Sequence, residues 1–235
     1  PRVAWLAVAV ALLAWLAAGA GLDGAALLAV VALLPTPLLL PRAGTAWSLP
    51  ALAPLLGAVA LGPAFVGVAG LARTPARRAG LGAAGFLWLA AAEALSEDRL
   101  LFGAPAEVPA PGAWESSLLA AATEALPPFL STPALAPALV WALFAALVPL
   151  AVRGRSLGFD LARGSLWAAA LIVTQLALGD LVDPGGLAAH GAVVGPLAAL
   201  LFAVLATAVR SGLREPFGRV GNPPPADPGD RPLVA

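Results

Sequence analysis

The sequence predicts an all-α, polytopic transmembrane helix bundle with six to seven spans, one of them a proline-broken or re-entrant segment. Hydrophobic residues make up 60% of the chain and charged residues only 11%, whereas a soluble domain is about half apolar and a quarter charged. Long apolar stretches follow one another along the chain, so a cleaved signal peptide does not explain them. We therefore expect residues 1–211 to form a multi-pass transmembrane domain whose partner is the lipid bilayer.

The composition also excludes several function classes. The formal net charge is zero, so there is no basic field to attract nucleic acid. The absence of cysteine excludes disulfides, thiolate metal sites and cysteine nucleophiles. Every cation is arginine, and the abundant residue types have G+C-rich codons. We therefore expect the source to be a high-G+C bacterium and the location to be the bacterial cell membrane.

The apolar stretches are long enough to place the spans. A helix needs roughly 20 apolar residues to cross the hydrocarbon core. Stretches of about this length lie at 3–22, 49–72, 81–102, 133–152, 161–181 and 187–209. The stretch 25–41 is marginal and contains Pro35 and Pro37, and the stretch 116–130 is shorter and contains Glu124. We predict that 116–130 is an interfacial or re-entrant piece.

The arginines predict the orientation of the bundle. Cytoplasmic loops of membrane proteins carry an excess of cations. The residues that we take as cytoplasmic topology determinants are Arg73, Arg77, Arg78, Arg153 and Arg155. The carboxyl terminus is then cytoplasmic as well. Residues 212–235 have too few apolar side chains to bury a core, so we expect a disordered cytoplasmic tail.

The side of the amino terminus depends on the stretch 49–72, and two arrangements are open. If this stretch crosses once, the amino terminus and Arg42 lie outside. If it enters and returns, kinked at Gly62 and Pro63, then Arg2 and Arg42 join the cytoplasmic arginines. We favour the second arrangement, with six full spans and both termini inside.

The five-residue sequence Pro-Ala-Leu-Ala-Pro occurs twice, at 50–54 and 133–137. In so alanine- and leucine-rich a chain, about one such identity is expected by chance, so an internal duplication stays open. Proline in the first turn of a helix costs no hydrogen bond. We therefore expect each copy to mark the start of a helix.

Four polar residues in or near the spans are candidate functional residues: Glu93, Glu124, Gln175 and His190. Ionisable residues inside a membrane are functional candidates by default. Glu93 is the strongest of them, although it lies near the outer interface. We expect Gln175 to bond a neighbouring helix. His190 is the only histidine, so it is an interfacial residue or an external pH sensor rather than a metal site. We predict no catalytic residue, cofactor or metal.

Several stretches resemble a multi-pass region at the carboxyl end of some actinobacterial serine/threonine protein kinases. They are PALAPLLG at 50–57, LAAAEAL at 89–95, RLLFG at 99–103 and VRGRSL at 152–157. The resemblance covers most of residues 1–210 and implies a cytoplasmic kinase domain upstream of Pro1, which suits the absence of methionine. The chain itself has no lysine, H-R-D or D-F-G sequence, so it carries no kinase catalytic residue.

Two functions follow from these observations. The leading hypothesis is a non-catalytic integral membrane domain that anchors or regulates a cytoplasmic signalling module, of the serine/threonine kinase type. The alternative is a small transporter or permease subunit, because prolines interrupt several apolar stretches and broken helices can build midplane binding sites. The oligomeric state stays open.

Overall fold

The computed structural model describes residues 2–41, 44–96, 98–105, 107–154, 156–182 and 189–212. Within these ranges the chain is helical and has no strand. The first half contains α1 (Arg2–Ala14), the π-helix η1 (Trp15–Gly19), α2 (Asp23–Leu33), α3 (Pro35–Leu39), the 3-10 turns η2 (Gly44–Ala46) and η3 (Leu49–Ala51), α4 (Leu52–Gly57), α5 (Ala64–Gly70) and α6 (Pro75–Ser96). The second half contains α7 (Pro111–Trp114), α8 (Leu118–Ala120), the π-helix η4 (Ala121–Ala125), α9 (Leu126–Phe129), α10 (Thr132–Ala151), α11 (Leu157–Val182) and α12 (Val194–Gly212).

Four helical segments of the described chain are long and apolar enough to cross a membrane. They are Arg2–Gly19, Pro75–Ser96, Thr132–Ala151 and Leu157–Val182. Two shorter apolar segments, Asp23–Leu39 and Val194–Arg210, lie beside them. The all-helical class and the membrane character are therefore supported, whereas six to seven spans stays a prediction.

Local sequence explains where the long helices begin. α6 begins at Pro75, because proline is preorganised for the first helical position and needs no hydrogen-bond partner there. The Thr74 hydroxyl accepts a hydrogen bond of 3.3 Å from the Arg77 N–H, which caps the helix. α10 begins in the same way, with the Ser131 hydroxyl accepting from the Ala134 N–H at 3.4 Å. Both Pro-Ala-Leu-Ala-Pro copies coincide with helix starts, in η3–α4 and in α10.

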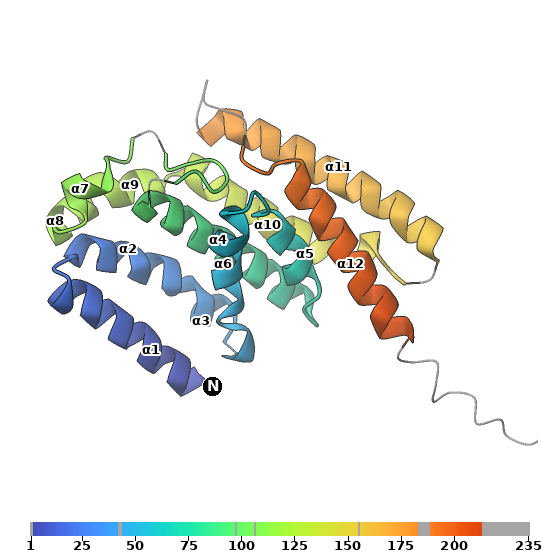
Figure 1. Cartoon of the computed structure of the whole chain (residues 1–235), viewed down its shortest axis with the longest axis horizontal. Coiled ribbons are helices and arrows are strands. Elements are labelled where there is room, and N and C mark those ends of the chain that lie inside the picture. Colours follow the sequence, from blue (N-terminus) through green and yellow to red (C-terminus); the bar gives the residue numbers. More distant parts are fainter. Residues whose placement is uncertain are drawn as a thin grey trace, which may run out of the picture.

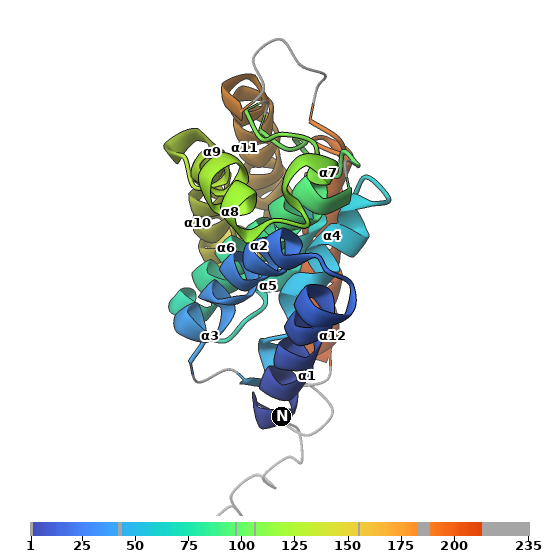
Figure 2. The same cartoon turned by 90° about the vertical axis from the view of Figure 1, so that its left-hand side faces the viewer.

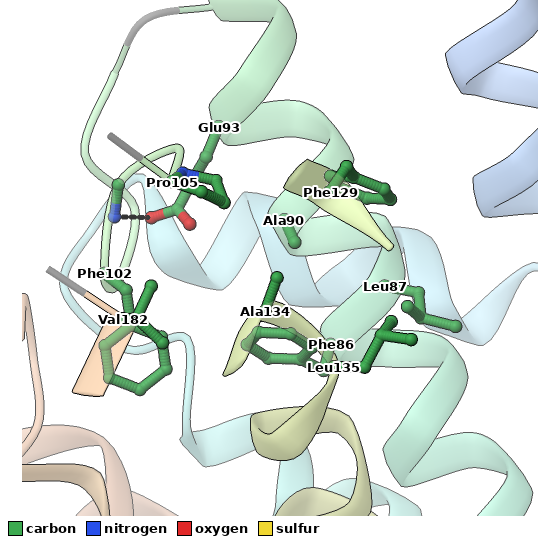
Figure 3. A pocket seen from close by; sticks show the side chains of 11 residues that line it. Phe86, Leu87, Ala90, Glu93, Phe102, Pro105, Phe129, Ala134, Leu135 and Val182 are labelled. Carbon is green, nitrogen blue, oxygen red and sulfur yellow. Dashed lines mark hydrogen bonds between the residues drawn. The ribbon is translucent and has the colours of Figure 1, made fainter. Parts of the chain in front are cut away.

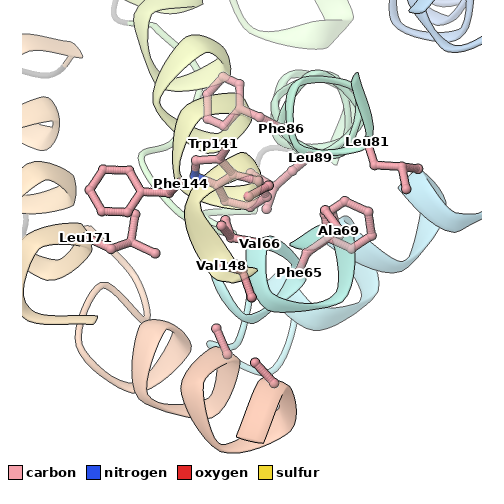
Figure 4. Close-up of a cluster of buried hydrophobic side chains, with 14 of the residues drawn as sticks. Phe65, Val66, Ala69, Leu81, Phe86, Leu89, Trp141, Phe144, Val148 and Leu171 are labelled. Carbon is pink, nitrogen blue, oxygen red and sulfur yellow. The ribbon is translucent and has the colours of Figure 1, made fainter. Parts of the chain in front are cut away.

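The core lies where α5, α6, α10, α11 and α12 meet (Figure 4). Trp141 of α10 is completely buried at its centre. Its ring stacks on Phe65 with the centroids 6.4 Å apart and meets Phe86 edge-on at 5.6 Å. Glycines bring the backbones close: a Cβ on Gly67 would lie 2.6 Å from the Ala199 carbonyl oxygen. Small residues at helix contacts are the usual packing device of membrane bundles.

The stretch 49–72 is not one straight helix. α4 and α5 are short, and residues 58–63 separate them. Ala60, in this connection, has a φ of 61°, a conformation that a helix cannot contain. Thr45 and Leu49, before α4, line the same cavity as Val68 and Arg73, at the end of α5. The chain therefore returns to the end of the bundle from which it entered (Figure 1).

Arginines gather at this end of the bundle, and both ends of the described chain lie there. The Arg2 side chain lies against Gly44, next to the cavity that Arg73 and Arg210 line. Figure 2 shows the amino terminus and the end of α12 at the same, lower end, with α7, α8 and α9 at the upper end. We call this the arginine end; it carries Arg2, Arg73, Arg77, Arg78, Arg153 and Arg210. Arg42, Arg155 and residues 213–235, with the predicted tail, lie outside the described residues.

Most of the carboxylates in the described residues lie at the opposite end, which we call the acidic end. α6 finishes here, and α11 joins it, because Val182 and Glu93 line one cavity. Glu93, Asp98, Glu107, Glu115, Glu124, Asp180 and Arg99 lie on or next to the end of α6, the short helices α7–α9 and the end of α11. Asp160, at the start of α11, lies at the arginine end instead.

Candidate functional site

Glu93 lies near the end of α6 and holds the loop that follows this helix. The side chain is only 2% exposed. Its Oε1 accepts hydrogen bonds from the backbone N–H groups of Leu101 and Gly103, the second at 3.0 Å. Gly103 has a φ of 86°, which favours glycine and lets the loop turn back over the helix. The carboxylate thereby supplies the hydrogen-bond acceptor that these two backbone N–H groups need.

A small cavity of about 20 Å³ lies beside the carboxylate (Figure 3). Its walls are mainly apolar and include Phe86, Phe102, Phe129 and Val182. A cavity needs about 10–15 Å³ to hold a water molecule, so this one has room for a single water. It is far smaller than the several hundred Å³ of ordinary small-molecule sites.

Arg99 is the charged neighbour of Glu93. It interacts electrostatically with the carboxylate, and its side chain lies about 4.0 Å from where a Cβ on Gly103 would be. A carboxylate with an opposite charge and two backbone donors is a satisfied structural group. The arrangement can hold the loop 98–105 in place and can position one water molecule.

His190 meets the same loop through its backbone. Its N–H donates to the Leu101 carbonyl oxygen at 2.6 Å, whereas its side chain is exposed. Leu101 therefore joins two of the four candidates, with its N–H bonded to Glu93 and its carbonyl oxygen to His190. The imidazole takes no part in this contact.

Gln175 lies on the buried face of α11, one turn after Leu171. The side chain is completely buried, and neither its amide oxygen nor its nitrogen has a hydrogen-bond partner in the described part of the chain. The interhelical hydrogen bond expected from the sequence is therefore not formed. An unsatisfied buried amide costs about 1–3 kcal/mol, so the Gln175 side chain lowers the stability of the folded core.

Glu124 is exposed on η4 and bonds neither Glu93 nor Gln175. The structure thus brings Glu93 and His190 to one loop and leaves the other two candidates apart. Within the ranges described, no group of three or more histidine, aspartate or glutamate side chains could hold a metal ion.

Two further buried polar residues, Asp160 and Thr36, lie outside the four candidates. Asp160 accepts hydrogen bonds from the N–H groups of Arg153 at 2.9 Å and Gly154 at 2.7 Å, whereas its spacing from Arg163 predicts an ion pair. Thr36 Oγ1 accepts from the Trp88 indole N–H at 3.2 Å, which ties α3 to α6. A polar residue inside an apolar stretch was the available signal for both. Their partners depend on the tertiary fold.

No family model, curated protein or solved structure matches this chain. The resemblance to the kinase-associated membrane region therefore stays a prediction.

Proposed function

We propose that the chain is a non-catalytic, multi-pass membrane domain that anchors or regulates a cytoplasmic signalling module, of the serine/threonine kinase type. The observation that supports it best is the use of the buried polar groups. Glu93, Asp160 and Thr36 each accept hydrogen bonds that hold the fold. These interactions suit a scaffold rather than a reaction centre.

The separation of charge supports an orientation. By the positive-inside rule, the arginine end faces the cytoplasm. Both ends of the described chain lie there, so an attached module would lie on the cytoplasmic side. Six spans follow if α1 with η1, α2 with α3, α6, α10, α11 and α12 each cross once and α4–α5 is re-entrant. Asp23–Leu39, at 17 residues and about 1.5 Å per residue, would span about 26 Å.

The proposal is tested by the coding DNA upstream of Pro1, read in frame. We expect this reading frame to continue into a cytoplasmic domain. The complete protein and a variant that lacks residues 2–212 would then be expressed and compared. The complete protein should sediment with membranes, and the truncated one should be soluble and altered in kinase activity. A start codon directly before Pro1, with no cytoplasmic protein co-purifying, would contradict the anchoring role.

One observation favours the transporter alternative. The break between α4 and α5 is the kind of interrupted helix from which transporters build binding sites. A transport role for Glu93 predicts that Glu93→Gln reduces the uptake of the transported substrate into reconstituted vesicles, measured over a panel of candidate substrates. Glu124→Gln is the matched control, because Glu124 is exposed at the same end. Unchanged uptake in Glu93→Gln vesicles would count against this alternative.

A further inference from the structure

Two large cavities lie side by side at the arginine end. Their volumes are about 460 Å³ and 510 Å³, within the range of about 300–1,000 Å³ that is usual for ligand sites. Leu71, Ala72, Arg73 and Arg210 line both of them. Arg73 and Arg210 therefore lie at the boundary between the two cavities.

Two more arginines complete the cationic lining. Arg78 lines the smaller cavity and Arg77 the larger one. The Nε of Arg78 donates to the Ala72 carbonyl oxygen at 2.8 Å, which fixes this side chain in the wall. Among the residues that the structure describes, no acidic one lines either cavity. The nearby Asp160 carboxylate is already bonded to the N–H groups of Arg153 and Gly154.

Apart from Thr45 in the larger cavity and Thr207 in the smaller one, the remaining lining residues are apolar. Val68, Leu81 and Phe202 line the larger cavity, and Val148 and Val152 line the smaller one. A ligand that matches both the arginines and the apolar walls carries an anionic group on a hydrocarbon or glycerol body. The planar guanidinium group matches phosphate with paired hydrogen bonds, and basic pockets between helices bind anionic lipid headgroups.

We propose that Arg73 and Arg210, with Arg77 and Arg78, form a binding site for a phosphate group, carried by an anionic lipid or by a soluble phosphate compound. The site is distinct from the Glu93 loop, which lies at the acidic end. It also does not depend on which module the domain anchors. Its failure would therefore leave the proposed function untouched.

The chain offers a matched control for a test by substitution. Arg153 is exposed at the same end and lines neither cavity. Arg73→Gln, Arg210→Gln and Arg153→Gln each remove one positive charge from this end. Arg210 is exposed in the last turn of α12, so its variant should fold even if Arg73→Gln does not.

The test is a titration of the purified chain in a neutral detergent, with the unfolding temperature as the readout. One series adds phosphatidylglycerol, a second adds phosphatidylcholine and a third adds inorganic phosphate against chloride at equal ionic strength. We expect a saturable rise of the unfolding temperature with phosphatidylglycerol that exceeds the rise with phosphatidylcholine. The fitted affinity should fall at least about tenfold in Arg73→Gln and Arg210→Gln, as for the loss of a charge-assisted hydrogen bond, and stay unchanged in Arg153→Gln.

The third series distinguishes the sources of the phosphate group. A saturable response to inorganic phosphate that both cavity variants lose would assign the site to soluble phosphate compounds as well. A response to phosphatidylglycerol alone would assign it to a lipid headgroup. The proposal is overturned if no ligand gives a saturable response, or if Arg153→Gln loses as much affinity as Arg73→Gln and Arg210→Gln.

Discussion

The carboxylate of Glu93 and the backbone N–H of Gly103 lie 3.0 Å apart, and this hydrogen bond ties the segment after α6 back to the end of that helix. The same oxygen accepts from Leu101, whose carbonyl oxygen in turn accepts from His190. The Glu93 side chain thus holds residues 101–103, and the backbone of Leu101 connects them to His190, which is far away in sequence.

Replacing Glu93 should therefore loosen this end of the bundle. We expect Glu93→Leu to lower the free energy of unfolding by about 2–4 kcal/mol, because two buried N–H groups lose their acceptor. Glu93→Gln keeps one acceptor oxygen and should cost less. The measurement is chemical unfolding in mixed micelles, with proteolysis of residues 98–105 as a local readout. Glu124→Leu, at an exposed position, should change stability by less than about 0.5 kcal/mol; an equal loss there would refute the role of Glu93.

Gln175→Leu should stabilise the protein. The buried amide has no hydrogen-bond partner in the described chain, so removing it relieves a cost of about 1–3 kcal/mol. Leu171→Ala, one turn away on the same buried face, should instead destabilise by about 2–5 kcal/mol. Thermal unfolding of both variants checks the pair. A destabilised Gln175→Leu protein would mean that the amide has a partner.

The contact between α5 and α12 should not tolerate a methyl group. A Cβ on Gly67 would lie 2.6 Å from the Ala199 carbonyl oxygen and 2.8 Å from its Cα. Because both are backbone atoms, the helices must separate, and we expect Gly67→Ala to cost about 1–3 kcal/mol. Gly158→Ala is the control, since nothing lies within 4 Å of its Cβ. It should stabilise α11 by up to about 1 kcal/mol. Equal unfolding temperatures for the two variants would contradict the close approach.

The absence of cysteine makes the orientation easy to test. Thr74 and Ser116 are exposed at the arginine end and the acidic end, respectively. In intact spheroplasts, a membrane-impermeant maleimide should label Ser116→Cys, and it should label Thr74→Cys only after permeabilisation. The reverse pattern would invert the proposed orientation. A tag attached before Arg2 should be protected from protease added outside the cell. If the protease removes it, the two termini do not lie on the same side of the membrane.

The sequence predicted the helices better than their ends. Their apolar length identified α6, α10 and α11, but α6 begins at Pro75 rather than at residue 81 because Thr74 and Pro75 supply a helix start. The last predicted stretch begins at 187, whereas α12 begins at Val194. Gly191, with a φ of 71°, cannot belong to a helix. Local capping and backbone conformation set these bounds, and hydrophobic length does not encode them.

The candidate residues were predictable by type but not by role. A glutamate inside an apolar stretch identified Glu93, but its partners lie eight and ten residues later in a loop whose path depends on Gly103. The unsatisfied amide of Gln175 could not be foreseen, because its surroundings come from the packing of other helices. The arginines were recognised as topology determinants, whereas the cavities that they line exist only in the folded bundle.

α1 has no buried residue, although it is among the most apolar helices of the chain. Its attachment includes the edge-on contact between Trp5 and Trp47, with the ring centroids 5.4 Å apart. In a bilayer, its position would depend on the surrounding lipid more than on the rest of the protein. Solubilisation should therefore release α1 before any other helix, and its amides should exchange hydrogen first when lipid is replaced by detergent.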